Sequence, residues 1–311
     1  MKPDFLLLAK GMLMGAADVV PGVSGGTIAF ITGIYDRLLQ AINGFLPAFF
    51  AFLSHRNFKQ FLIAADATFI AHVFGGILIS IALASKLILF LLSEHPLPLW
   101  SFFFGLIVAS SFLISKELNY KHISSWLFTL LGIVVAVFIV RGVPGEMDAS
   151  PLNAFFAGSI AICAMILPGI SGSFILVLLG AYTFILGAVS SLNMPVLLAF
   201  MFGCLIGLLC FSRLLVFALA HARTVVVSVL LGFMIGSLYK VWPWKHVLSF
   251  RENRHGELVP LIEKNVLPQD FAVLTGEDPQ LMLSVACGLA AVILVYVAQQ
   301  FSARLNPMNR T

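Results

Sequence analysis

Two short runs of glycine and hydroxyl residues interrupt apolar sequence at matching places. The first is Pro21-Gly22-Val23-Ser24-Gly25-Gly26, and the second, 147 positions later (168 minus 21), is Pro168-Gly169-Ile170-Ser171-Gly172-Ser173. Glycine lets the backbone approach a ligand closely, and a serine beside a helix start adds a hydroxyl to free N–H groups that favour negative charge. The runs therefore have the chemistry of an anion site, although a pair of packed helix kinks is the alternative.

The predicted phosphate-binding residues belong to these runs and to one pair of cations. Lys86 and Arg213 occupy equivalent places in apolar segments, since Ser85-Lys86-Leu87 aligns with Ser212-Arg213-Leu214 at an offset of 127 (213 minus 86). A cation in a membrane segment is costly and is a functional candidate by default; the alternative is that each side chain extends to the interface. The predicted set is Ser24, Gly25, Gly26, Thr27, Ser171, Gly172, Ser173, Lys86 and Arg213.

Three more titratable residues are candidates for gating or coupling to an ion. Asp18 precedes the first run, and its counterpart is Met165, so the carboxylate is not repeated. It either caps the following helix or takes up a proton or sodium ion. Asp66 and His72 lie in one long apolar segment, where each either titrates during the functional cycle or faces a polar vestibule. We predict no catalytic residue, no metal site and no cofactor.

Composition places these residues in a membrane. Of 311 residues, 60% are hydrophobic and 10% are charged, whereas a soluble domain has about 45–50% apolar and about 25% charged residues. The net charge of +4 does not single out nucleic acid as a partner. The four cysteines lie in apolar segments without a CxxC pair, which predicts packing residues.

The elements that position the runs are predicted to be helices, because backbone polar groups in lipid need internal partners. Two pieces of about 16 residues flank the first run and are short for a span, which takes about 20. They predict a broken or re-entrant hairpin over about 5–42. The first repeat, residues 1–145, then continues with spans at about 61–92, 97–115 and 124–140.

The second repeat, residues 146–311, has the same order. A hairpin is predicted over about 152–186, with spans at about 195–220, 224–242 and 281–301. An insertion at 243–280, mixed in charge and rich in proline, is predicted to be an exposed extracytoplasmic loop. The predicted fold class is an all-α polytopic integral membrane protein of two inverted-topology repeats, each a hairpin plus about three transmembrane helices.

The predicted orientation follows from the basic residues. If each hairpin enters and leaves on one side, three spans per half invert the second half relative to the first. Basic residues in the termini and short loops then fall almost entirely on one side, which places both termini in the cytoplasm. If the runs instead span the membrane, the inverted relation weakens. Inverted repeats with broken helices near the bilayer midplane are typical of secondary transporters.

The paired runs resemble a known bacterial family. The residues from Asp18 to Thr27, followed by Gly33-Ile34-Tyr35-Asp36, and the second run with Gly180-Ala181-Tyr182 are similar to domain-of-unknown-function family 368, now described as polyprenyl-phosphate transporters. The resemblance covers nearly the whole chain. It implies an inner-membrane flippase that returns undecaprenyl phosphate from the outer to the cytoplasmic leaflet for reuse in peptidoglycan and surface-polymer synthesis. Its partners would be that lipid, membrane lipids and a proton or sodium ion.

Two other functions stay open at this stage. An ion-coupled transporter of a small anion would use the same site with a smaller cavity. Membrane undecaprenyl-pyrophosphate phosphatases also have an inverted repeat and a similar PGxSRSxxT motif, but here Gly25-Gly26 replaces Arg-Ser and no glutamate occurs from Met1 to Ser93. Hydrolysis would lack its arginine clamp and its acidic residue. We therefore predict that the protein is not an enzyme.

Overall fold

The computed structural model describes residues 4–19, 23–116, 118, 122–142, 145, 147–252 and 258–305. Pro21 and Gly22 of the first run lie outside the described residues. The chain forms two compact units, one made of residues 1–88 with 117–236 and the other of 89–116 with 237–311. Each unit contains parts of both predicted repeats, and each is described by itself.

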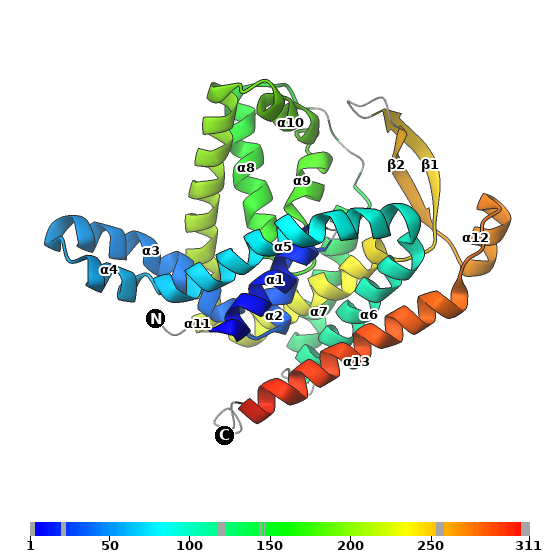
Figure 1. The fold of residues 1–311 in the computed structure, drawn as a ribbon, viewed down its shortest axis with the longest axis horizontal. Helices are drawn as coiled ribbons and strands as arrows, with labels where there is room; N and C mark the ends of the chain where they lie inside the picture. Colours follow the sequence, from blue (N-terminus) through cyan, green and yellow to red (C-terminus); the bar gives the residue numbers. More distant parts are fainter. Residues whose placement is uncertain are drawn as a thin grey trace. The chain divides into compact units, whose positions relative to one another are not determined.

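The described part of the first half consists of seven helices joined by short segments (Figure 1). Its helices are α1 (Phe5–Val19), α2 (Gly25–Ile31), α3 (Tyr35–His55), α4 (Phe58–Ala64), α5 (Ala67–Glu94), α6 (Pro96–Ser115) and α7 (Ile123–Val140). The second arm of the predicted hairpin is not one piece, because a turn at Gly33 separates α2 from α3. Helix α3 continues to His55, with Pro47 inside it.

The second half follows the same order and adds an inserted subdomain. Its elements are α8 (Pro151–Ile166), α9 (Gly172–Leu178), α10 (Tyr182–Ser190), α11 (Met194–Val241), β1 (Lys245–Glu252), β2 (Leu258–Asn265), α12 (Pro268–Thr275) and α13 (Leu281–Leu305). Helix α11 is interrupted at Ala222, whose φ of −142° and ψ of 45° are not helical. This kink lies between the predicted spans 195–220 and 224–242.

The two halves share a turn of the same conformation. Gly33 has φ of +70° and Gly180, 147 positions later, has φ of +71°. In each turn the residue after the glycine donates its N–H to a carbonyl five positions back: Ile34 to Ala29 and Ala181 to Leu176. Glycine adopts this left-handed conformation at little cost. The matching sequence flanks therefore encode matching backbone.

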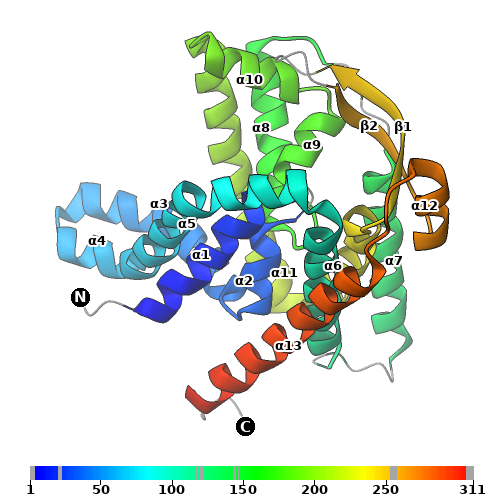
Figure 2. The ribbon, with the colours of Figure 1, turned by 45° about the vertical axis from the view of Figure 1, so that its right-hand side comes forward.

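Each half also has the same close helix crossing. A methyl group at Gly76 of α5 would clash with the carbonyl oxygen of Leu8 on α1, and one at Gly203 of α11 would clash with that of Phe155 on α8. These pairs are equivalent, since 203 minus 76 is 127 and 155 minus 8 is 147. Figure 2 shows α8 beside the first part of α11. Glycine is needed at each crossing because the helix backbones touch.

The later helices pair across the two halves. In one unit, Gly132 of α7 packs on Gly232 of α11; in the other, Gly105 of α6 packs on Gly288 of α13. Gly105 corresponds to Gly232 at offset 127 and Gly132 to Gly288 at offset 156. Exchanging the halves therefore converts one contact into the other. Each half supplies one member of each pair.

The described residues contain enough long apolar helices for several membrane crossings. Four helices, α3, α6, α7 and α11, are long and apolar enough, and there are up to six spans if each of two bent pairs counts as one. Helices α6 and α7 match the predicted spans 97–115 and 124–140. The predicted span 61–92 is instead divided at residues 65–66, where α4 and α5 are bent by 66°. Helices α9 and α10 are bent by 108°.

The insertion is structured, and the all-α prediction is wrong there. Strands β1 and β2 form an antiparallel hairpin in which Lys245 pairs with Asn265, and α12 follows. Buried Trp244 and Phe271 pack with Leu97 of α6, and the indole N–H of Trp244 donates to the carbonyl of Pro279 at 2.9 Å. This small core folds a segment whose charge and proline content predicted only an exposed loop.

Candidate functional site

The two glycine-serine runs meet in the first compact unit. The backbone N–H of Gly169 donates to the hydroxyl of Thr27 at 2.8 Å, and the hydroxyl of Ser24 donates to the carbonyl of Met165 at 3.0 Å. Ser24 and Thr27 are each only 1% exposed. The structure thus joins segments more than 140 positions apart through side chains that the sequence marks as site residues.

The first run is shaped by the start of α2. Ser24 is its N-cap, with extended backbone, and its hydroxyl accepts from the N–H of Gly26 at 3.1 Å. The Asp18 carboxylate accepts from the N–H of Gly25 at 2.7 Å. Asp18 therefore makes the capping contact that was one of its two predicted roles. A methyl group at Gly26 would lie 2.8 Å from the Met165 carbonyl oxygen, so glycine permits the approach of the second half.

The second run has a different internal arrangement. Gly169 has φ of +89°, and a methyl group there would lie 2.7 Å from the carbonyl oxygen of Phe233, so both backbone conformation and space require glycine. The hydroxyls of Ser171 and Ser173 lie 2.9 Å apart. Ser171 precedes α9 without making a side-chain cap. The two runs are related in sequence but unequal in their polar contacts.

The described donors at this junction are held by internal acceptors. The N–H groups of Gly25, Gly26 and Gly169 donate to Asp18, Ser24 and Thr27. Buried donors need such partners, since an unpaired one costs about 1–3 kcal/mol. A phosphate could bind here only by replacing these acceptors with its own oxygens. The junction is chemically suited to binding and releasing an anion, because it contains hydrogen-bond donors that can exchange partners.

The predicted cations lie at the protein surface. Lys86 and Arg213 are both exposed, and the Arg213 Nε donates to the side-chain oxygen of Asn43 on α3 at 3.2 Å. In the described part of the chain, neither cation hydrogen-bonds to the two runs. The structure therefore assembles Ser24, Thr27 and Gly169 directly, but leaves the cation pair outside this junction.

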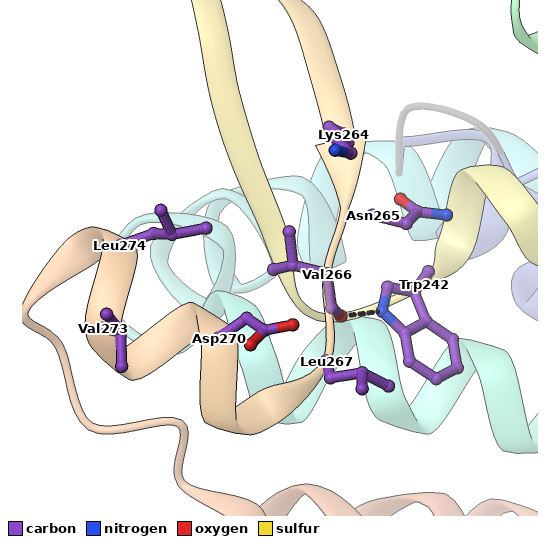
Figure 3. Close-up of a pocket in the computed structure, with 8 residues that line it drawn as sticks. All are labelled: Trp242, Lys264, Asn265, Val266, Leu267, Asp270, Val273 and Leu274. Atoms are coloured by element: carbon purple, nitrogen blue, oxygen red, sulfur yellow. Dashed lines mark hydrogen bonds between the residues drawn. The ribbon is translucent and has the colours of Figure 1, made fainter.

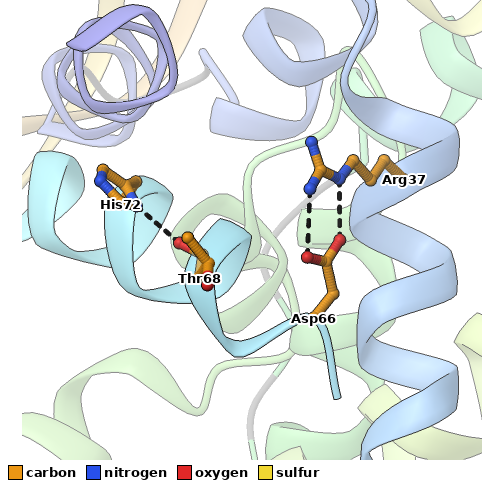
Figure 4. Close-up of polar contacts among 4 residues, drawn as sticks. All are labelled: Arg37, Asp66, Thr68 and His72. Carbon is orange, nitrogen blue, oxygen red and sulfur yellow. Dashed lines mark hydrogen bonds and ion pairs between the residues drawn. The ribbon is translucent and has the colours of Figure 1, made fainter. Parts of the chain in front are cut away.

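Asp66 marks the break between α4 and α5 (Figure 4). Its carboxylate makes a two-pronged ion pair with the Arg37 guanidinium, at 2.7 Å to Nε and 3.1 Å to Nη2. The same guanidinium lies 4.5 Å from the centre of the Phe69 ring. Asp66 itself has φ of +45°, a conformation that aspartate tolerates better than most residues. Asp66 thus lies at the bend between α4 and α5, where the sequence contains neither glycine nor proline.

His72 connects α5 to the start of α1. Its Nδ1 lies 2.6 Å from the carbonyl of Thr68 (Figure 4), and its Nε2 accepts the backbone N–H of Asp4 at 3.1 Å. A backbone N–H can only donate, so Nε2 carries no proton and Nδ1 donates to Thr68. His72 therefore ties the start of α1 to α5 through one hydrogen bond at each ring nitrogen.

Sequence reasoning missed two contacts made by basic side chains of the first compact unit. The Lys10 ammonium on α1 donates to the carbonyl of Thr32 at 2.7 Å, at the end of α2, where a cation is favoured by the helix dipole. Arg223, just after the kink in α11, pairs with Asp36 on α3 at 2.8 Å. The signal for Lys10 was its isolation in an apolar segment, but its partner is a backbone group that no sequence pattern marks.

No group of three or more His, Cys, Asp or Glu side chains suited to a metal ion occurs among the residues that the structure describes. The polar groups at the junction are backbone N–H groups, hydroxyls and the Asp18 carboxylate. Hydroxyls and backbone amides can hydrogen-bond an anion.

Several long apolar helices and a buried junction of two glycine-serine runs, which match in sequence, are the features of a multi-pass membrane protein. The family model that matches residues 14–259 is described as VCA0040-like, undecaprenyl phosphate translocase-like. The chain belongs to this family, and the resemblance predicted from the two runs is confirmed.

Two curated relatives support the assignment. A protein of Vibrio cholerae serotype O1 named polyprenyl-phosphate transporter is 45% identical over 295 residues, covering 95% of this chain and 96% of the relative. A Staphylococcus aureus protein of the same name is 34% identical over 254 residues, covering 76% of this chain and 85% of the relative. Both names describe transport and neither describes an enzyme. No solved structure matches the chain.

Proposed function

We propose that this protein transports polyprenyl phosphate across the membrane and does not act as an enzyme. The family description and the names of the two relatives support this substrate class. The finer proposal is a flippase that returns undecaprenyl phosphate from the outer to the cytoplasmic leaflet of the bacterial inner membrane, for reuse in peptidoglycan and surface-polymer synthesis. Both termini then lie in the cytoplasm, as the basic residues predict.

The observation that carries this proposal is the contact between the runs through Thr27 and Gly169. Repeated broken helices that meet in the membrane form the substrate sites of many secondary transporters. We assign the phosphate to this junction, where Ser24, Gly25, Gly26 and Gly169 offer donors once Asp18, Thr27 and Met165 are displaced as acceptors. Ser171, Gly172 and Ser173 complete the site from the second half.

In this proposal the structure corresponds to a state with the junction closed. Substrate phosphate and the Asp18 carboxylate compete for the Gly25 N–H, because two negative groups cannot share one donor cheaply. Uptake of a proton or sodium ion by Asp18 would weaken its hold and link ion entry to phosphate entry. Asp66 and His72 are proposed as gating residues, since Asp66 sets the bend before α5 and His72 ties α5 to α1.

The exposed cations suit a lipid substrate. A prenyl tail that stays in the bilayer spares the cost of moving it through a polar pore, about 0.8 kcal/mol for each CH₂ group. The phosphate then arrives along the protein surface, where Lys86 and Arg213 are exposed. We propose that they receive the phosphate from opposite halves before it enters the junction. Alternating access of two inverted repeats would present the site to one leaflet and then to the other.

The direct test labels lipid-linked phosphate at the outer face of cells. Cells that lack the protein are expected to accumulate the label relative to cells that carry it. An unchanged outer pool would refute transport in the proposed direction. In cells that lack the wild-type protein, Arg213→Ala at normal expression should lower the labelled outer pool much less than the wild type does. Lys59→Ala, which removes an exposed cation on α4, should lower it as far as the wild type does. Undiminished transport by Arg213→Ala would remove that residue from the mechanism.

Purified protein in liposomes distinguishes the substrates. Undecaprenyl phosphate, its pyrophosphate and inorganic phosphate are offered in turn under defined proton and sodium gradients. Movement of undecaprenyl phosphate alone is the expected result. Transport of inorganic phosphate would instead establish a small-anion transporter, and release of phosphate from the pyrophosphate would establish a phosphatase.

A further inference from the structure

The inserted subdomain contains a cavity of about 510 Å³, lined by Trp242 just after α11, by residues of β2 and α12, and by the segment between them (Figure 3). It belongs entirely to the second compact unit and is separate from the junction of the two runs in the first. Its lining residues are Trp242, Lys264, Asn265, Val266, Leu267, Asp270, Val273 and Leu274.

The cavity begins where a membrane helix ends. Trp242 directly follows Val241, the last residue of α11, and the subdomain returns to the apolar helix α13 at Leu281. Three tryptophans lie around this end. The ring centres of Trp242 and Trp244 are 5.6 Å apart, and the Lys245 ammonium lies 4.4 Å from the ring centre of Trp100. Tryptophan is enriched at the level of the lipid headgroups. A cavity at the end of such a helix would lie at headgroup depth.

Its outer walls are apolar and unusually exposed. Leu267 is 60% exposed, Val273 is 84% exposed and Leu274 is 50% exposed. On helix α12, Phe271 is buried, whereas Val273 and Leu274 are exposed. Exposed apolar walls beside a membrane helix are suited to hydrocarbon rather than water. They provide a surface for the upper part of a lipid chain.

The polar lining carries one charge of each sign. Lys264 comes from β2 and Asp270 from the first turn of α12, and Figure 3 shows them on different walls of the cavity. Both are exposed. Among the residues that the structure describes, neither has an ion-pair partner, whereas the neighbouring Glu263 is shared by Lys240 at 3.1 Å and Lys245 at 3.6 Å. Glu263 is thus paired within the protein, whereas Lys264 and Asp270 in the cavity could each pair with a charge on a ligand.

We propose that this cavity binds the headgroup of a zwitterionic phospholipid with a primary ammonium, that is, a phosphoethanolamine lipid of the surrounding bilayer. Lys264 receives the phosphate and Asp270 receives the ammonium. The first carbons of the acyl chains lie against Leu267, Val273 and Leu274. The bound lipid anchors the inserted subdomain at the membrane surface.

The two charges decide between headgroups. An anionic phospholipid would pair with Lys264 but would bring negative charge toward Asp270, which is unfavourable. A phosphocholine headgroup has no N–H to donate to the Asp270 carboxylate, whereas an ethanolamine ammonium can form a charge-assisted hydrogen bond there. The arrangement therefore favours phosphoethanolamine over both.

The test uses the full chain, purified in detergent, delipidated and incubated with defined mixtures of phosphatidylethanolamine, phosphatidylcholine and phosphatidylglycerol. Native mass spectrometry counts the lipid of each class that stays bound. The wild type is expected to retain one phosphatidylethanolamine with about fivefold preference over the other two, in keeping with partly exposed ion pairs. Asp270→Asn should abolish the preference over phosphatidylcholine, and Lys264→Gln should weaken retention of all three.

Glu277→Gln is the matched control, because it removes an exposed charge from the same subdomain without touching the cavity lining. It should behave as the wild type. All positions are exposed, so folding is expected to survive, and unchanged thermal unfolding in detergent verifies this. Equal retention of the three lipids by the wild type would overturn the proposal. A preference for phosphatidylglycerol, or a preference that Asp270→Asn leaves intact, would overturn it as well.

Discussion

The hydroxyl of Thr27 accepts the backbone N–H of Gly169 at 2.8 Å, linking residues 142 positions apart. This bond is buried, and it is the closest polar link between the two glycine-serine runs. The first half thus provides the acceptor for the N–H of a buried glycine in the second half, whose φ is +89°. The Thr27 hydroxyl should therefore contribute to the stability of the junction, together with the Ser24 hydroxyl that donates to Met165.

Removing that hydroxyl should destabilise the protein. Thr27→Val keeps the shape of the side chain but leaves the Gly169 N–H unpaired, at a cost of about 1–3 kcal/mol. Thr27→Ser should retain most of the stability. Thermal unfolding in detergent measures the effect.

Thr32→Val is the control for this substitution. The Thr32 hydroxyl donates to the Ile28 carbonyl within the same turn of chain, and that carbonyl also accepts the Thr32 backbone N–H. Its loss should therefore have little effect. Equal losses of stability in the two variants would show that the bond between Thr27 and Gly169 makes no special contribution.

The equivalent glycine crossings predict equivalent sensitivity in the two halves. Gly76→Ala and Gly203→Ala each press a methyl group against a backbone carbonyl, and each should lower stability by about 1–3 kcal/mol. Gly75→Ala is the control, because its nearest contact would be a flexible leucine carbon at 3.9 Å. Monodispersity and thermal unfolding after extraction are the measurements. A large loss in Gly75→Ala, or tolerance of Gly203→Ala, would contradict the assigned packing.

The ion pair at the α4–α5 break should contribute little to global stability. Arg37 is 51% exposed and Asp66 is 35% exposed, so solvent screening leaves about 0–1 kcal/mol. Asp66→Asn tolerates the same backbone conformation and should cost no more than that. Asp66→Val should cost more, because a β-branched residue strains at φ of +45°. Thermal unfolding of the two variants separates the effect of losing the charge from the effect of backbone strain. Equal losses of stability in the two variants would refute the explanation by backbone strain.

The inserted subdomain should become more stable as the pH rises above about 8. Burial lowers the pKa of Lys245 from 10.5 to about 8, although the Glu263 carboxylate opposes this shift. Between these values the unfolded chain binds more protons than the folded one, so the free energy of unfolding increases with pH until about 10.5. The charged ammonium costs stability below the folded pKa, and its deprotonation relieves that cost.

Lys245→Met should remove this rise, because it retains the alkyl chain against Trp100 without a titrating group. Thermal unfolding across the same pH range measures the difference between this variant and the wild type. Lys264→Met is the control, since Lys264 is exposed and should leave the pH dependence intact. A parallel pH profile for wild type and Lys245→Met would contradict the burial effect.

The sequence predicted those features that repeat or that follow from local chemistry. Gly33 and Gly180, which the sequence aligns, occupy turns of the same conformation, although neither turn was predicted. The predicted spans 195–220 and 224–242 are separated in the structure by the kink at Ala222. The break at Asp66 was missed because it carries neither glycine nor proline. Conversely, Pro47 lies inside α3 without ending it.

Partners distant in sequence were beyond prediction for a physical reason. Ser24 and Thr27 lie at the N-cap and in the first turn of α2, and their acceptor and donor are backbone groups of Met165 and Gly169. Any residue offers the same backbone groups, so side-chain identity cannot reveal them. The β-hairpin of the insertion was missed in the same way, since its core depends on Trp244 and Phe271 packing on Leu97 of a distant helix.

The reciprocal glycine contacts, Gly132 with Gly232 and Gly105 with Gly288, bear on the origin of the chain. A polypeptide of half this length would possess one side of each contact and lack the other. Two copies could satisfy both by lending each other a helix, as subunits of a dimer do. Fusion of two such genes would then have turned an association between molecules into packing within one molecule, and left each half unable to complete its own fold.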